Sequence, residues 1–280
     1  MMDAARPRRR MVRPHVLPSM LTLGNLFCGF LAIAKAADAM REPAGSAGMF
    51  DLLQFAGWMI FLGMVFDALD GSVARMSGGT SAMGNVLDSL ADVVTFGAAP
   101  AFLAKCIAEG AGGMHDRRLS LWFSVFFALM AALRLARYSS DQGDPEEASL
   151  WFEGLPTPGA AGVIAAIAIL IGDHEWRPED AVLRALPWVT LGLGLLMVSK
   201  LPYAHATNRF LKGRKPVTYL VLALLMIVLS LAWKVEVVLA GLLLVYTLSG
   251  PVAWMIRRRK AGRSGGPAGS PVGVLEKEER

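Results

Sequence analysis

The sequence alternates between long apolar runs and short polar breaks. Most of the runs are about 18–25 residues long, which is the length of a helix that crosses the hydrocarbon core of a bilayer. Glycine, proline and charged residues interrupt the runs, whereas the core of a soluble domain would be cut into shorter pieces. The pattern predicts an all-α, polytopic membrane bundle of about eight transmembrane helices, at residues 16–38, 51–75, 83–110, 118–139, 158–172, 181–200, 216–233 and 235–256.

The composition agrees with this class. Hydrophobic residues make up 54% of the chain and charged residues 18%, against about 25% charged residues in a soluble domain. The net charge of +5 is compatible with nucleic acid, but the basic residues lie mostly beside the apolar runs, where they orient helices and meet anionic lipid. None of them forms a stretch interleaved with aromatics, as binding of single-stranded nucleic acid requires. We therefore expect membrane lipids and no nucleic acid among the partners.

The distribution of charge predicts the orientation in the membrane. Most of the 28 lysines and arginines fall on one side of the bilayer if the N-terminus is cytoplasmic and the number of helices is even, as the positive-inside rule favours. We expect a multi-pass protein of the cell membrane with both termini in the cytoplasm. The expected organisation is a basic cytoplasmic N-terminus at 1–15, a transmembrane domain at 16–256 and a disordered cytoplasmic tail at 257–280, whose glycine, proline and charge cannot support a packed core.

Four aspartates interrupt the apolar pattern at two neighbouring helix ends. Asp67 and Asp70 share one face at the end of the second predicted helix, and Asp88 and Asp92 share one at the start of the third, because residues three or four apart lie together on a helix. A short turn makes the two helices antiparallel neighbours. We expect the two acidic faces to point at each other near the cytoplasmic surface.

Acids inside a membrane are costly and normally mark a function. A pair of divalent cations would offset the repulsion among the four carboxylates, and hard oxygen ligands suit Mg²⁺ or Mn²⁺. The small residues Gly71, Ala74 and Gly84 lie on the same faces. They would let the helix backbones and a bulky ligand come close.

The aspartates belong to a longer pattern, D-x2-D-G-x2-A-R-x8-G-x3-D-x3-D, whose fixed positions are Asp67, Asp70, Gly71, Ala74, Arg75, Gly84, Asp88 and Asp92. This pattern resembles the signature of the CDP-alcohol phosphatidyltransferase family. Stretches at 17–25, 96–101 and 152–158 resemble its phosphatidylserine synthase branch, and the likeness extends over about 16–203. Ser19 stands where the family commonly has Asn, so the nucleotide contact usually given to that Asn is not carried over.

The resemblance implies a reaction and a set of roles. An alcohol attacks the β-phosphorus of a CDP-linked lipid and CMP leaves; in the serine branch the substrates are CDP-diacylglycerol and L-serine, and the product is phosphatidylserine. Two Mg²⁺ or Mn²⁺ ions would be held by Asp67, Asp70 and Asp88, and Asp92, a fourth member of the metal site, would act as general base for the serine hydroxyl. The residues expected to border the nucleotide and its phosphates are Thr22, Asn25, Gly71, Ala74, Arg75 and Gly84. Homodimers are common in such families, and the oligomeric state stays open.

Several alternatives remain open. Arg134 and Arg137, at the cytoplasmic end of the fourth predicted helix, could bind the serine carboxylate or a lipid phosphate, or could be ordinary positive-inside anchors. A family member with another acceptor, glycerol 3-phosphate or an inositol phosphate, is the nearest rival function. An ion-coupled transporter is a rival from another class, although transporters usually place such acids near the midplane of internally repeated folds.

Overall fold

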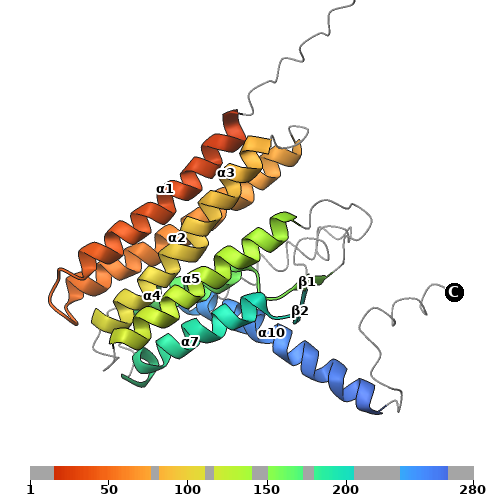
Figure 1. Cartoon of the computed structure of the whole chain (residues 1–280). Helices are drawn as coiled ribbons and strands as arrows, with labels where there is room; N and C mark the ends of the chain where they lie inside the picture. The colour runs from red at the N-terminus through yellow and green to blue at the C-terminus, as the bar shows by residue number, and fades with distance from the viewer. Residues whose placement is uncertain are drawn as a thin grey trace, which may run out of the picture.

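A computed structural model of the chain describes residues 16–76, 82–110, 117–140, 151–172, 180–204 and 234–263. The helices within these ranges are α1 (Val16–Ala39), α2 (Ala47–Met76), α3 (Ala82–Asp92), the π-helix η1 (Val93–Ala98), α4 (Ala99–Gly110), α5 (Arg117–Ser140), α6 (Thr157–Gly172), α7 (Asp180–Val198) and α10 (Val235–Arg263). Two three-residue strands, β1 (Trp151–Glu153) and β2 (Pro202–Ala204), complete the described elements. Figure 1 shows the helices lying side by side, with α10 running outward at an angle to the others.

The predicted bundle is confirmed as a polytopic helical membrane protein. Within the described ranges, five helical segments are long and apolar enough to cross a membrane, and two shorter apolar helices accompany them. Large apolar side chains such as Phe27, Phe30 and Trp122 are exposed by 64%, 66% and 66%, as lipid-facing side chains are. The predicted span at 216–233 and the basic N-terminus at 1–15 lie outside the described residues.

Two predicted boundaries differ from the structure. The single helix expected at 83–110 is interrupted by η1, where the backbone N–H of Ala99 donates to the carbonyl of Val94, five residues back as in a π-helix. The tail is expected from the sequence to begin at 257, but α10 continues to Arg263, so the helix carries its basic residues beyond the apolar span. The remainder of the tail, from 264, lies outside the described residues.

Small residues form the centre of the bundle. Ala32 and Ala36 of α1, Ala56 of α2 and Ala165 of α6 are fully buried, and a Cβ placed on Gly57 would lie 2.7 Å from the Ala165 carbonyl oxygen. Such close backbone contact is how helices associate where lipid removes the hydrophobic driving force. It fixes α2 against α6, and α1 in turn packs against α2.

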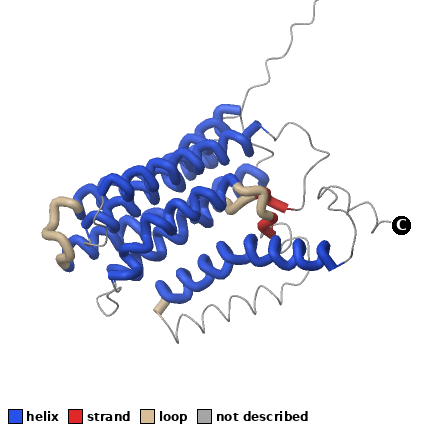
Figure 2. Tube along the Cα trace, turned by 60° about the horizontal axis from the view of Figure 1, so that its bottom comes forward, coloured by secondary structure: helices blue, strands red, loops and turns tan. Residues whose placement is uncertain are grey.

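The two short strands join distant parts of the chain. β1 pairs with β2 in antiparallel register, with Phe152 opposite Tyr203, and in Figure 2 they lie together at one end of the helices. Burial raises the pKa of Tyr203 to about 12, so its hydroxyl stays protonated and donates to the carbonyl of Thr247 in α10 at 3.0 Å. The stretches around 152–158 and 199–203, far apart in sequence, thus form one structural unit.

Candidate active site

Three of the four aspartates form a compact group. Asp67 and Asp70 of α2 and Asp88 of α3 each offer a carboxylate oxygen, and these oxygens all lie within 4.8 Å of one another. The helical spacing predicts this arrangement, since it places each pair of acids on one face. Asp92 is not a member of the group of three, but its carboxylate interacts electrostatically with those of Asp67 and Asp88.

Helix α1 holds the aspartates through two polar side chains. The hydroxyl of Thr22 donates to Asp70 Oδ2 at 2.8 Å, and the amide of Asn25 donates through Nδ2 to Asp92 Oδ1 at 3.1 Å. Thr22 is 4% exposed and Asn25 is fully buried. Since α1 packs against both α2 and α3, its polar positions connect the two acidic helices.

The group has the properties of a cation site. Among the described residues, no lysine, arginine or histidine forms an ion pair with these aspartates. Within the same part of the chain, the buried Oδ1 of Asp88 has no hydrogen-bond partner. A buried acceptor without a donor is unfavourable, and carboxylate oxygens are the ligands that hard divalent cations prefer. The residues present therefore fit a metal ion, and the cluster could hold one.

The structure describes only some of the residues that were expected to border the nucleotide. Gly71 and Gly84 are half-buried beside the aspartates on α2 and α3. The side chains of Ala74 and Arg75 lie outside the described part of the chain. The predicted nucleotide contacts of Thr22 and Asn25 stay predictions, because the structure directs both side chains at aspartates.

A second polar cluster lies where α5, α6 and α10 meet. Arg134 of α5 is half-buried and donates through Nη1 to the hydroxyl of Thr157, the first residue of α6, at 3.0 Å; it also interacts electrostatically with Tyr246 of α10. Arg137 is exposed. The two arginines predicted as a pair therefore occupy different environments, and Arg134 is the one that faces the protein interior.

Gly154 sets the position of Thr157. Its φ of +81° belongs to the region that glycine alone adopts without strain, and a Cβ there would lie 2.8 Å from the Ser199 carbonyl oxygen. The backbone N–H of Gly154 donates to the Leu201 carbonyl at 2.9 Å. The turn before α6 is thereby fixed to the segment at the end of α7, which explains the glycine in the stretch at 152–158.

Sequence reasoning missed three residues that contact this region. Thr95 of η1 is fully buried and its hydroxyl donates to the backbone carbonyl of Asn25 at 2.9 Å. Gly29 of α1 and Gly63 of α2 lie against it. One signal was available: Thr95 is a polar residue inside an apolar run, three positions after Asp92.

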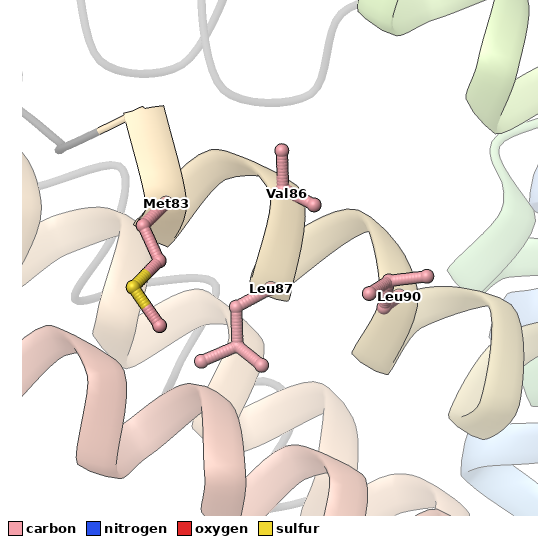
Figure 3. Close-up of a pocket in the computed structure, with 4 residues that line it drawn as sticks. All are labelled: Met83, Val86, Leu87 and Leu90. Atoms are coloured by element: carbon pink, nitrogen blue, oxygen red, sulfur yellow. The ribbon is translucent and has the colours of Figure 1, made fainter.

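Helix α3 has an apolar side as well as its acidic one. Met83, Val86 and Leu90 are exposed by 80%, 61% and 58%, and with Leu87 they line a shallow apolar hollow of about 430 Å³. Figure 3 shows these four side chains along one side of α3. Exposed apolar side chains of this kind are typical of helix surfaces that face lipid, and here they lie on the same helix as Asp88 and Asp92.

Comparisons with known proteins agree with the motif. A profile of the CDP-alcohol phosphatidyltransferase family matches residues 15–198. The chain is 29% identical over 243 residues to a CDP-diacylglycerol–serine O-phosphatidyltransferase of Helicobacter pylori, covering 86% of this chain and 92% of that one. It is 32% identical over 189 residues to the enzyme of that name from Bacillus subtilis, covering 68% and 90%, and 34% identical over 164 residues to that from Methanocaldococcus jannaschii, covering 58% and 70%. With its aspartate pattern, helical membrane fold and these matches, the chain belongs to the CDP-alcohol phosphatidyltransferase family.

Proposed function

We propose that this protein transfers the phosphatidyl group of CDP-diacylglycerol to the hydroxyl of L-serine and releases phosphatidylserine and CMP. The observation that carries the proposal is the group of three carboxylates within 4.8 Å, with Asp92 beside it and no compensating cation among the described residues. The choice of serine is supported by the names of the relatives in Helicobacter pylori and Bacillus subtilis. The transporter alternative has no such support, since the acids gather at adjoining helix ends.

Two Mg²⁺ or Mn²⁺ ions would be held by the carboxylates of Asp67, Asp70 and Asp88. When bound, these ions would neutralise negative charge on the diphosphate and on the departing CMP. Thr22 holds Asp70 by its 2.8 Å hydrogen bond and so keeps one ligand in place. Gly71 and Gly84 are proposed to border the nucleotide beside the carboxylates, and Ala74 and Arg75 are further candidates in that part of α2.

Asp92 is proposed as the general base. The serine oxygen forms a bond to the β-phosphorus, the bond between that phosphorus and the CMP oxygen breaks, and the proton of the serine hydroxyl passes to the Asp92 carboxylate. A general base of this kind typically contributes about 10²–10⁴-fold to a rate. Asn25 donates to Asp92 Oδ1, and Oδ2 is the oxygen proposed to take the proton.

Arg134 is the candidate for the acceptor carboxylate. It is half-buried and anchored by Thr157 at 3.0 Å, and an arginine held in this way binds carboxylates or phosphates with charge-assisted hydrogen bonds. Arg137 is exposed and fits better the role of an anchor in the lipid headgroups. The diacylglycerol part of the donor would lie against the apolar side of α3.

The proposal also includes topology and organisation. The aspartates and both termini are assigned to the cytoplasmic side, on the distribution of basic residues, and the catalytic domain spans 16–256. A homodimer stays a prediction from the family resemblance. Labelling of single cysteines introduced at the two ends of the bundle, in intact and opened vesicles, tests the orientation.

The experiment that tests the function is CMP release by the purified protein with CDP-diacylglycerol and Mn²⁺ or Mg²⁺. Three acceptors are compared: L-serine, glycerol 3-phosphate and an inositol phosphate. Release that depends on L-serine alone is the expected result. Release with a phosphorylated acceptor would keep the aspartate mechanism and discard serine, and no release with any acceptor would contradict the proposed activity.

A further inference from the structure

The helix that carries Asp92 changes geometry immediately after it. Residues 93–98 form the π-helix η1, in which the Ala99 N–H donates to the Val94 carbonyl. Such a turn holds about one residue more than an α-helical turn, and it occurs frequently at functional sites. One extra residue rotates the next helix, α4, by about 100° around the common axis, since an α-helix has 3.6 residues per turn. The side chains of α3 and α4 therefore point in directions that do not follow from a single α-helix. This change in helix geometry lies beside Asp92, the proposed base.

Thr95 of η1 fits into a notch made by two glycines. A Cβ on Gly29 of α1 would lie 2.7 Å from Thr95 Cα, and one on Gly63 of α2 would lie 2.6 Å from Thr95 Cγ2. Real Cβ atoms do not approach so closely, so neither position accepts a larger residue without a shift. The notch holds Thr95 from two helices while its hydroxyl donates to the Asn25 carbonyl at 2.9 Å.

Asn25 is enclosed on the same side. It is fully buried, its Oδ1 would lie 3.0 Å from a Cβ on Gly63, and its Nδ2 donates to Asp92 at 3.1 Å. The polar contacts therefore form a chain in which Thr95 binds the Asn25 backbone and the Asn25 side chain binds Asp92. Thr95 is only three residues beyond Asp92, so both of its links to Asp92, along the backbone and through Asn25 of α1, are short.

We infer that Asn25 and Thr95 are positioning residues for Asp92: Asn25 holds the carboxylate by one oxygen, and Thr95 in its glycine notch holds Asn25. The inference rests on the proposed function, in which Asp92 accepts the serine proton. From the sequence, Asn25 is expected to contact the nucleotide and so to affect substrate binding. The positioning role instead predicts that Asn25 affects the rate of the chemical step. A displacement of about 1 Å in a reacting group can lower a rate about 10²-fold.

The variants that test this inference separate the hydrogen bonds from packing. Asn25→Ala removes the donor to Asp92, Thr95→Val removes the hydroxyl at nearly constant shape, and Thr95→Ser keeps the hydroxyl. Thr190→Val is the matched control, because Thr190 is also fully buried and also donates to a backbone carbonyl, that of Leu186, but lies on α7. For each variant, kcat and the KM for both substrates are measured, together with Mn²⁺-dependent binding of CDP-diacylglycerol without serine.

Asn25→Ala and Thr95→Val are expected to lower kcat about 10–100-fold, because a misplaced reacting group lowers a rate on this scale. The KM for CDP-diacylglycerol and the binding of that lipid should stay within about threefold of wild type, and Thr95→Ser and Thr190→Val should retain kcat. A raised KM for CDP-diacylglycerol with an unchanged kcat would make Asn25 a nucleotide contact and overturn the inference. Equal losses in Thr95→Val and Thr190→Val would overturn it too, since packing alone would then explain them.

A double variant tests the inference by a second route. If Asn25 acts only through Asp92, adding Asn25→Ala to Asp92→Asn should lower the residual rate by less than about twofold, because residues that act as one unit are not additive. A further loss as large as in the wild-type background would contradict the inference. Wild-type protein that does not turn over serine would instead refute the proposed function, so the two failures are distinguishable.

Discussion

Both ends of the segment at 82–110 place acids inside the bundle, but the acids differ in the partners that surround them. Glu109 near the end of α4 pairs with Lys105 at 2.9 Å and accepts from Ser120 of α5 at 3.1 Å. Asp88, about 30 Å away at 1.5 Å per residue, has a buried oxygen with no partner among the described residues. Glu109 is neutralised by a lysine of the protein itself, whereas within the described ranges no lysine or arginine pairs with the aspartates of the candidate site.

This contrast separates a structural acid from a functional one. A buried acid with its own cation and hydroxyl can be explained by the joining of two helices, here α4 and α5. Three carboxylates within 4.8 Å weaken the fold unless a ligand binds them, because like charges repel and intramembrane acids are costly. The arrangement is therefore understandable as a binding site and not as a stabilising contact.

The largest effect is expected from Asp70→Asn, which removes a proposed metal ligand. Turnover should fall by about 10³-fold or more, since metal ions supply several kcal/mol of transition-state stabilisation, and Mn²⁺-dependent binding of CDP-diacylglycerol should be lost as well. The matched control is Glu109→Gln, which makes the same carboxylate-to-amide change at the other end. If both variants bound Mn²⁺ equally well, the contrast between the two ends would be wrong.

Asp92→Asn should separate chemistry from binding. Because it removes a base, it is expected to lower kcat about 10²–10⁴-fold while lipid binding stays largely intact. Serine-dependent CMP release and equilibrium binding of CDP-diacylglycerol measure the two quantities. Normal turnover by this variant would rule out Asp92 as the base.

A smaller effect is expected from Thr22→Val, which removes the hydroxyl that donates to Asp70 at 2.8 Å. Loss of such a supporting contact should weaken the apparent affinity for Mn²⁺ about 10–100-fold, and saturating Mn²⁺ should restore much of the rate. A titration of activity against Mn²⁺ concentration measures this shift. An unchanged titration would mean that Thr22 does not support the metal site.

The smallest effect on turnover is expected from Lys105→Met at the other end. Glu109, whose side chain is 10% exposed, would lose its cation, so the free energy of unfolding should fall by about 1–3 kcal/mol. Serine-dependent kcat should stay within about twofold of wild type. Adding Glu109→Gln should recover much of the stability, and a loss of kcat without a loss of stability would contradict the structural role assigned to this pair.

The sequence predicted the helices well because length and hydropathy determine them. Every predicted span within the described residues has a counterpart, and the spacing of Asp67, Asp70 and Asp88 was enough to place them together. The π-helix after Asp92 was not predicted, because the apolar pattern does not show which residues of other helices meet it; in the structure these are Gly29 and Gly63, which lie against Thr95.

Contacts between distant residues were beyond the reach of pattern alone. The hydrogen bonds of Thr22 and Asn25 reach aspartates 48 and 67 positions away, and the nucleotide contacts expected for the two residues stay predictions. The pairing of Phe152 with Tyr203 likewise depends on how α6 and α7 pack, because a three-residue strand has too little periodicity to be recognised.

Transfer to the serine hydroxyl can be followed by tracing the oxygen atom of the acceptor. L-Serine labelled with ¹⁸O in its hydroxyl is incubated with CDP-diacylglycerol, Mn²⁺ and the purified protein, and the lipid product is analysed by mass spectrometry. The expected product is phosphatidylserine that retains the label fully, in amounts equal to the CMP released. CMP formed without labelled phosphatidylserine would show that water or another acceptor attacks the phosphorus, and would contradict transfer to the serine hydroxyl.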